Sequence, residues 1–180
     1  MTRHEAAHDP APVAAWALLV YTVPAKPTRK RATVWREVKR LGALYLRDGV
    51  CALPDTPAAR AALQALAERV QALDGEATLI WEARLSPARA SALRAALTSA
   101  RRAEYAEVAS AAVSLLRHLE QEVAHHALER SARIGLCGEL GRVERWLAQI
   151  EARDYLSDGD PQSVAAVIAA ARAALADGAA

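Results

Sequence analysis

The residues best suited to chemistry in this chain are six cations between positions 29 and 40: Arg29, Lys30, Arg31, Arg36, Lys39 and Arg40. The concentration is local, because the whole chain has 23 basic and 21 acidic residues. Guanidinium and ammonium groups bind phosphates and other oxyanions. The segment therefore predicts contact with nucleic-acid phosphates or with a small oxyanion.

The spacing of these cations places most of them on one side of a helix. At 100° per residue, Lys30 lies on the flank of a face formed by Arg29, Arg36, Lys39 and Arg40. The opposite face is formed by Val34, Trp35, Val38 and Leu41. The expected helix N-terminus at residues 29–31 also favours anions. A cationic face that is only solvated has the same pattern, and the sequence leaves both interpretations open.

A second group of candidate ligands lies on one face of a later helix: His118, Glu122, His125 and Glu129. Glu122-x-x-His125 has the form of the ligand pairs in di-iron helical bundles. Such a centre needs a second copy and two further carboxylates, and the sequence has no second copy. We expect a solvated flank beside an apolar helix contact, with a metal site at His118, Glu122 and His125 as the alternative.

No other constellation indicates catalysis. The sequence has no Gly-rich phosphate loop and no nucleophile elbow, so we expect neither an enzyme nor a bound cofactor. Cys51 and Cys137 are far apart and indicate free thiols, with Cys51 buried on a strand. Tryptophans 16, 35 and 81 are expected to anchor the core.

The elements around the cationic segment follow from turn and cap residues. A strand is predicted over 16–23 and ends at Pro24 and Pro27. Thr28 is expected to cap a helix over 29–41, and Gly42 to end it. Strands over 43–47 and 50–53 flank Asp48-Gly49, a hairpin turn.

A second helix is predicted to begin at Pro57, with Thr56 as its cap, and to end near Leu73; a strand over 76–84 follows. This order predicts an α+β fold: a ferredoxin-like βαββαβ domain over residues 14–85, preceded by a disordered leader over 1–13.

Residues 86–180 are expected to be helical. One helix begins at Pro87 and extends to about residue 128, and a second pairs with it in a helical hairpin that turns within 131–138. Arg153-Asp154 is expected to be a structural ion pair that braces the two halves of the chain. A last alanine-rich helix follows Pro161.

Composition limits the remaining possibilities. The chain has 180 residues, 53% of them apolar, with no Phe, which suits one small domain plus helices in close contact. The apolar run over 13–23 is shorter than the ~20 residues that a bilayer-spanning helix needs. We expect a cytoplasmic protein without a membrane segment.

Residues 18–54 and their surroundings resemble the N-terminal domain of the bacterial chromate-resistance family ChrB. The resemblance rests on Val20-Tyr-Thr-Val-Pro24, Pro27-Thr-Arg-Lys-Arg31, Val34 to Ala43 and Leu46-Arg-Asp-Gly-Val-Cys-Ala-Leu-Pro-Asp-Thr-Pro57. Gly75-Glu-Ala77, Arg102-Ala-Glu-Tyr105 and Ile150-Glu-Ala-Arg-Asp-Tyr155 resemble further segments of the family. Family members usually continue into a second, C-terminal domain of comparable size, whereas this sequence stops at Ala180.

The resemblance implies a cytoplasmic regulator that senses chromate and controls an efflux gene. We therefore expect a DNA-associated module whose partners are duplex DNA and chromate, with a homo-oligomer as a further expectation. The alternative is an interaction or dimerisation scaffold without DNA binding. The fold pattern also resembles Cas-type ferredoxin-like proteins, but Tyr21-Thr-Val-Pro24 has no carboxylate where the nucleases among them carry one.

Overall fold

The structure is a computed structural model that describes residues 15–124 and 130–177. The expected leader over 1–13 lies outside the described residues. The chain divides into two compact units, one up to Ala95 and the other from Ala96. The division falls inside the long helix α3 (Pro87–Ala124), so the first turns of this helix belong to the first unit.

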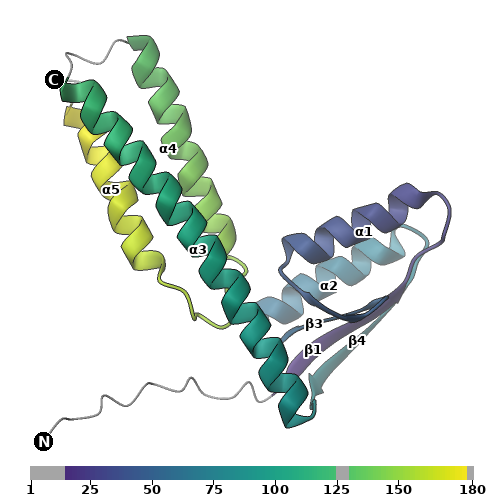
Figure 1. Ribbon diagram of the computed structural model, residues 1–180. Helices are drawn as coiled ribbons and strands as arrows, with labels where there is room; N and C mark the ends of the chain where they lie inside the picture. Colours follow the sequence, from purple (N-terminus) through teal and green to yellow (C-terminus); the bar gives the residue numbers. More distant parts are fainter. Residues whose placement is uncertain (1–14, 125–129, 178–180) are drawn as a thin grey trace, which may run out of the picture. The chain divides into compact units, whose positions relative to one another are not determined.

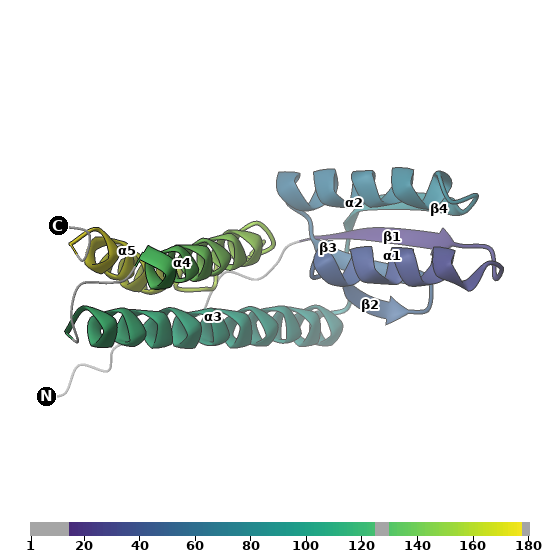
Figure 2. The same cartoon turned by 90° about the horizontal axis from the view of Figure 1, so that it is seen from above.

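The first unit is an antiparallel sheet covered on one face by two helices. In chain order its elements are β1 (Trp16–Thr22), α1 (Thr28–Arg40), β2 (Leu44–Arg47), β3 (Val50–Pro54), α2 (Pro57–Gln71) and β4 (Glu76–Ala83). The strand order across the sheet is β2-β3-β1-β4. Helices α1 and α2 lie side by side on the same face (Figure 1) (Figure 2). The predicted ferredoxin-like α+β arrangement is confirmed.

The core of this unit follows from the two-residue period of the strands. Leu19 in the central strand β1 is paired with Cys51 and Leu79 in its two neighbours, and all three belong to the face beneath the helices. Leu19 and Cys51 have no exposed surface. Val38 of α1 and Leu63 of α2 are equally buried. Each of these buried valine and leucine side chains contributes about 1.5–3 kcal/mol by leaving water.

Most element ends lie where the sequence indicates. Gly42 follows α1 with a φ of +69°, and the Thr56 side chain caps α2 by accepting a hydrogen bond from the Ala59 amide at 3.1 Å. The predicted cap at Thr28 is wrong. Thr28 is the first helical residue of α1, and Pro27 precedes it without a side-chain hydrogen bond. The chain turns one residue earlier than a threonine cap requires, because the Pro27 carbonyl accepts the Lys30 amide at 3.1 Å.

Asp55 connects three parts of the first unit. Its side chain is 2% exposed, and it accepts hydrogen bonds from Arg60 Nε at 2.5 Å and Nη2 at 2.9 Å. It also accepts the backbone amide of Glu82 at 2.6 Å. Glu82 has a φ of +55° at an irregularity in the pairing of β4 with β1. The carboxylate therefore holds the end of β3, the start of α2 and this irregularity together, and the Arg60 guanidinium lies 5.4 Å from the Trp81 ring centroid.

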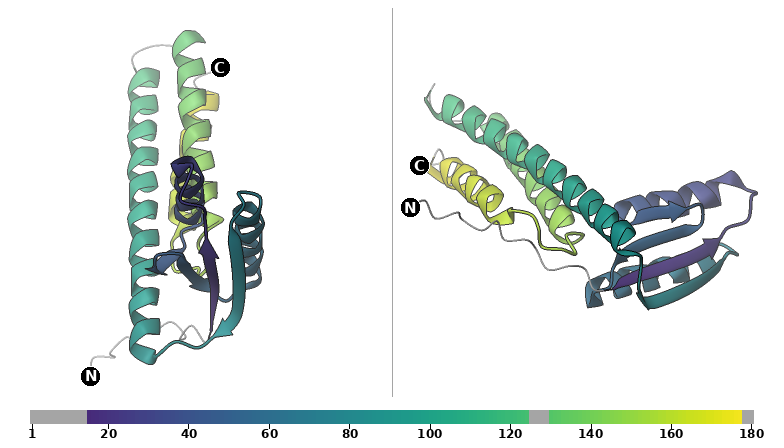
Figure 3. Two further views of the ribbon diagram at one scale, coloured as in Figure 1. Left: turned by 90° about the vertical axis from the view of Figure 1, so that its right-hand side faces the viewer. Right: turned by 60° about the horizontal axis from the view of Figure 1, so that its bottom comes forward.

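The second unit is built from helices. It contains the remainder of α3, followed by α4 (Arg130–Glu151) and α5 (Pro161–Asp177) (Figure 3). Its core is a continuous apolar cluster that includes Val108 and Leu119 of α3, Ile150 of α4 and Val164 of α5. No described helix is both long and apolar enough to cross a membrane.

The turn predicted within residues 131–138 is wrong, because this segment is helical and belongs to α4. The segment contains two glycines, Gly135 and Gly138. Glycine in a helix costs about 1 kcal/mol relative to alanine, and burial of Leu136 and Leu140 in the core opposes that cost.

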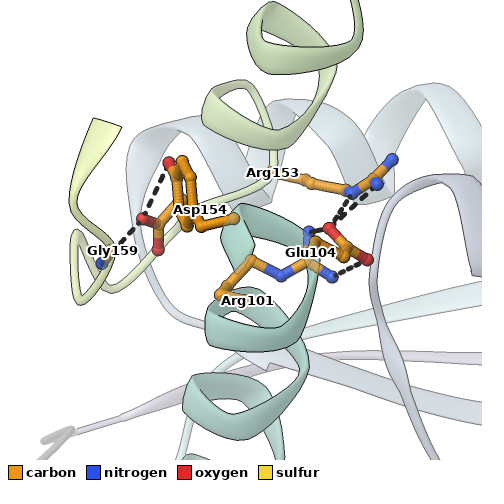
Figure 4. Close-up of polar contacts among 6 residues, drawn as sticks. Arg101, Glu104, Arg153, Asp154 and Gly159 are labelled. Carbon is orange, nitrogen blue, oxygen red and sulfur yellow. Dashed lines mark hydrogen bonds and ion pairs between the residues drawn. The ribbon is translucent and has the colours of Figure 1, made fainter. Parts of the chain in front are cut away.

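Two of the segments that resemble the ChrB family meet in the second unit (Figure 4). Glu104 of α3 accepts hydrogen bonds from Arg101 at 2.8 Å and from Arg153 at 2.9 and 3.1 Å. Asp154 accepts the Tyr105 hydroxyl at 3.3 Å and the Gly159 amide at 3.2 Å. The expected pair of Arg153 with Asp154 is therefore wrong. Each of the two residues instead contacts α3, because consecutive residues at the end of a helix point in different directions.

We predict that Asp55→Asn lowers the free energy of unfolding by about 1–2 kcal/mol at neutral pH, because the charge-assisted hydrogen bonds from the partly exposed Arg60 are weakened. The hydrogen bond from Arg60 lowers the pKa of Asp55. The stabilisation is complete above the unfolded-state pKa of about 3.9 and disappears as the pH falls through the lower folded-state pKa. The measurement is urea unfolding of both proteins across the acid range. A stability difference that does not shrink at low pH would contradict the role of the ionised carboxylate.

A second prediction concerns Gly159, because a Cβ atom there would lie 1.9 Å from Cε2 of the buried Tyr105. We expect Gly159→Ala to destabilise the second unit by about 1–3 kcal/mol through overpacking. Gly138→Ala is the matched control, since a Cβ at that helical position meets nothing within 4 Å. The control should be stabilising by about 1 kcal/mol. The measurement is thermal unfolding of both variants. Equal changes in stability for the two variants would refute the packing argument.

Candidate nucleic-acid interface

Helix α1 packs on its own unit through a narrow apolar row. Val34 and Val38, one turn apart, are 1% and 0% exposed. Trp35, expected on the same face and in the core, is 53% exposed. It lies 100° around the helix from Val34, and the valine row alone makes the buried contact. The prediction for Trp35 is therefore wrong, whereas Trp16 is 1% exposed as expected.

Two of the six cations of α1 are neutralised within the first unit. Lys30 Nζ lies 2.5 Å from a carboxylate oxygen of Asp74, in the turn between α2 and β4. Arg40 pairs with Glu37 one turn earlier, at 2.8 Å. The sequence indicates the second pair, because Glu37 lies three residues before Arg40. The first pair joins residues 44 positions apart, and local spacing cannot indicate it.

The other four cations are Arg29, Arg31, Arg36 and Lys39, and all four are exposed. Within residues 15–124 and 130–177, no carboxylate pairs with any of them. Arg36 donates a 3.4 Å hydrogen bond to the Thr33 hydroxyl, and the Lys39 ammonium lies 5.9 Å from the Trp35 ring centroid. The exposed ring of Trp35 thus lies among the unpaired cations of α1.

A cavity of about 780 Å³ lies beside α1. Its lining combines aromatic rings, hydroxyls and one charge of each sign: Tyr21, Thr28, Arg31, Trp35, Tyr45 and Asp48. The lining therefore comes from the end of β1, one flank of α1, strand β2 and the turn that follows β2. Of the six predicted contact residues, Arg31 is the one that lines this cavity.

Two tyrosines form a polar pair on the sheet side of the cavity. The hydroxyl oxygens of Tyr21 and Tyr45 lie 3.0 Å apart. Burial raises the pKa of both side chains, and for Tyr21 the hydrogen bond with Tyr45 adds to the effect. Both hydroxyls therefore stay protonated at neutral pH, so the pair keeps O–H donors and lone pairs available to a ligand.

The sequence interpretation missed this cavity, although a signal for it exists. Tyr21 lies two residues after the core residue Leu19 and thus on the same face of β1. Tyr45 is paired with the buried Cys51, which places Tyr45 on that face as well. Strand periodicity together with the Asp48-Gly49 turn would have brought the two rings together.

The second predicted ligand group is only partly described. His118 Nε2 lies 3.8 Å from Glu122, and both side chains are about half exposed. His125 and Glu129 lie outside the described residues. In the part of the chain that the structure covers, no group of three metal-ligating side chains occurs.

Both cysteines are free thiols, as expected. Burial in the core of the first unit raises the pKa of the Cys51 thiol to about 12. A thiol with this pKa is almost wholly protonated at neutral pH and is a poor nucleophile. Cys137 is exposed on α4.

The fold and the unpaired cations of α1 define a class of protein. It is a small ferredoxin-like domain with a basic first helix, followed in the chain by a helical unit. A family model described as "Protein ChrB, N-terminal" matches residues 31–180. The chain belongs to this family.

A curated relative, "Protein ChrB" of Cupriavidus metallidurans, is 43% identical over 70 residues. The match covers 39% of this chain and 21% of the relative, so it spans about a fifth of that protein's length. No solved structure matches the chain.

We predict that a disulfide-exchange reagent modifies one thiol in the native protein, Cys137, and two after denaturation. The reason is the contrast between the buried Cys51, with its raised pKa, and the exposed Cys137. The measurement is a timed thiol titration of the native protein. The Cys137→Ser variant should show no fast reaction, and fast modification of Cys51 in that variant would contradict the burial argument.

Proposed function

We propose that this chain is a DNA-associated regulatory module of chromate resistance that binds duplex DNA through α1 and controls an efflux operon. Membership of the ChrB family supports the link with chromate resistance. The free cations of α1 support contact with phosphates. In this proposal the chain acts in the cytoplasm by binding and catalyses no reaction.

The observation that carries the proposal is the division of the α1 cations into paired and unpaired ones. Lys30 and Arg40 are held by carboxylates of the same unit. Arg29, Arg36 and Lys39 have no acidic partner among the described residues, so contact with a phosphate breaks no existing ion pair. The three residues share the solvent side of α1, opposite the Val34–Val38 row. Their spacing suits contacts along one stretch of a DNA backbone.

Chromate enters the proposal as a competing oxyanion. Its oxygens would accept hydrogen bonds from the same guanidinium groups that contact phosphate. A chromate ion held at α1 would therefore reduce the attraction of this helix for DNA. This competition provides a physical route from chromate concentration to DNA occupancy.

The second candidate function is a dimerisation scaffold, and one observation favours it. Val20 of β1 and Ile80 of β4 are 38% and 41% exposed. Both belong to the sheet face opposite α1 and α2, because each is one residue out of phase with a core position. Exposed apolar side chains on an open sheet face suit contact with a second copy of the chain.

We predict that duplex DNA from the region upstream of the gene binds the protein with an affinity that falls steeply with salt. Each phosphate contact contributes about 0.9 to the slope of log K against log salt concentration. The triple variant Arg29→Glu, Arg36→Glu and Lys39→Glu should lose binding at moderate salt. Fluorescence anisotropy with labelled duplex at several salt concentrations measures both effects.

The matched control is Arg69→Glu, Arg117→Glu and Arg145→Glu, which makes the same change in net charge at exposed positions of other helices. Loss of binding in both triple variants would mean that net charge alone is responsible, against the assignment of α1. Sedimentation of the wild-type protein addresses the scaffold reading. A tight dimer that does not bind DNA at low salt would favour the dimerisation scaffold over the DNA-associated regulator as the function of the chain.

A further inference from the structure

We propose that the cavity beside α1 binds one nucleotide unit, with the base against Trp35 and the phosphate at Arg31. The inference goes beyond the proposed duplex contact, because it uses an open pocket beside α1 and an aromatic ring in addition to the charged face. It rests on the proposed function only in that both place nucleic-acid phosphates at α1.

The exposed ring of Trp35 is the first reason. More than half of this side chain is in contact with solvent, although it lines the cavity. Stacking of a base on an exposed aromatic side chain is a main source of affinity for unpaired nucleotides, and it tolerates any base. The Lys39 ammonium near the same ring adds positive charge close to a bound nucleotide.

The charges and hydroxyls around the cavity are the second reason. Arg31 lines it and has no carboxylate partner in the described part of the chain, so its guanidinium is available to a phosphate. Asp48 also lines the cavity. A carboxylate there disfavours a purely anionic ligand and accepts hydrogen bonds from a base edge. The neutral Tyr21 and Tyr45 hydroxyls offer both donors and acceptors.

The size of the cavity indicates that the bound nucleotide is unpaired. A volume of about 780 Å³ lies within the range of about 300–1,000 Å³ for small-molecule sites. One base with its sugar and phosphate is a ligand of that class, whereas a base that remains paired and stacked in a duplex cannot enter. The nucleotide must therefore come from a single strand or from a free mononucleotide.

The test fills the cavity without removing any charge. Ala32 is exposed on α1 and lines the cavity, so Ala32→Phe should fold and occupy the space. Ala61→Phe is the matched control at an exposed position of α2 that is not part of the lining. Three probes are titrated into each protein: a short labelled oligothymidylate, thymidine monophosphate and a duplex.

We expect Ala32→Phe to weaken oligothymidylate binding at least tenfold, while Ala61→Phe leaves the binding of both oligothymidylate and duplex unchanged. Trp35→Ala should weaken single-strand binding by about five- to a hundredfold, which corresponds to the loss of one stacked base. If thymidine monophosphate saturates the wild-type protein but not Ala32→Phe, the site takes free nucleotides. If only the oligothymidylate binds the wild-type protein and not Ala32→Phe, the site binds a nucleotide within a single strand. Both results support a nucleotide site.

Equal single-strand affinity of wild type and Ala32→Phe would overturn the proposal. Such a result leaves the duplex contact standing if duplex binding is still lost in the Arg29, Arg36 and Lys39 triple variant. Conversely, single-strand binding that depends on the cavity, without any duplex binding, would overturn the proposed duplex contact and support the nucleotide site. The two proposals can thus fail separately.

Discussion

The hydrogen bond from the Tyr21 amide to the Gly49 carbonyl, at 2.7 Å, is the constraint on which the candidate site depends. It attaches the β2–β3 turn to the last part of β1. Gly49 has a φ of +71°, and a Cβ atom there would lie 2.5 Å from the Tyr21 carbonyl oxygen. Only glycine permits this approach without movement of the turn. The same constraint brings Tyr21 and Tyr45 within hydrogen-bond distance, so the sheet side of the cavity is fixed by backbone geometry.

Helix α1 forms the other side of the cavity. Some residues of α1 attach the helix to its unit, and others are exposed cations. The valine row attaches the helix, and Lys30 adds an ion pair to the turn before β4. Arg29, Arg31, Arg36 and Lys39 contribute to none of these contacts within the described chain. Substitutions at exposed positions that make no such contact usually change stability by less than about 0.5 kcal/mol, so the fold loses little if these cations are exchanged. What their loss changes is the electric field over α1, which governs attraction of anions.

The sequence predicted those elements whose ends depend on local chemistry. Asp48-Gly49, Gly42 and the Thr56-Pro57 pair each act over one to four residues, and the structure has a turn, a helix end and a capped helix at these positions. The ferredoxin-like order of strands and helices follows from such local signals. The exposure of Trp35 was not predictable in this way, because it depends on how wide a row of α1 the rest of its unit covers. The helical path through Gly135 and Gly138 likewise depends on tertiary burial of Leu136 and Leu140, which outweighs intrinsic propensity.

The same limit applies to polar contacts. The sequence pattern identified Arg153 and Asp154 but paired them with each other, and their actual partners are some 49 residues away on α3. In both units a carboxylate accepts hydrogen bonds from a side chain and from a backbone amide, at Asp55 in the first and at Asp154 in the second. These two carboxylates stabilise chain reversals and belong to neither the cavity lining nor the cations of α1. Stability and ligand contact therefore depend on different residues. For that reason, substitutions of the unpaired cations of α1 can report on binding without the ambiguity of partial unfolding.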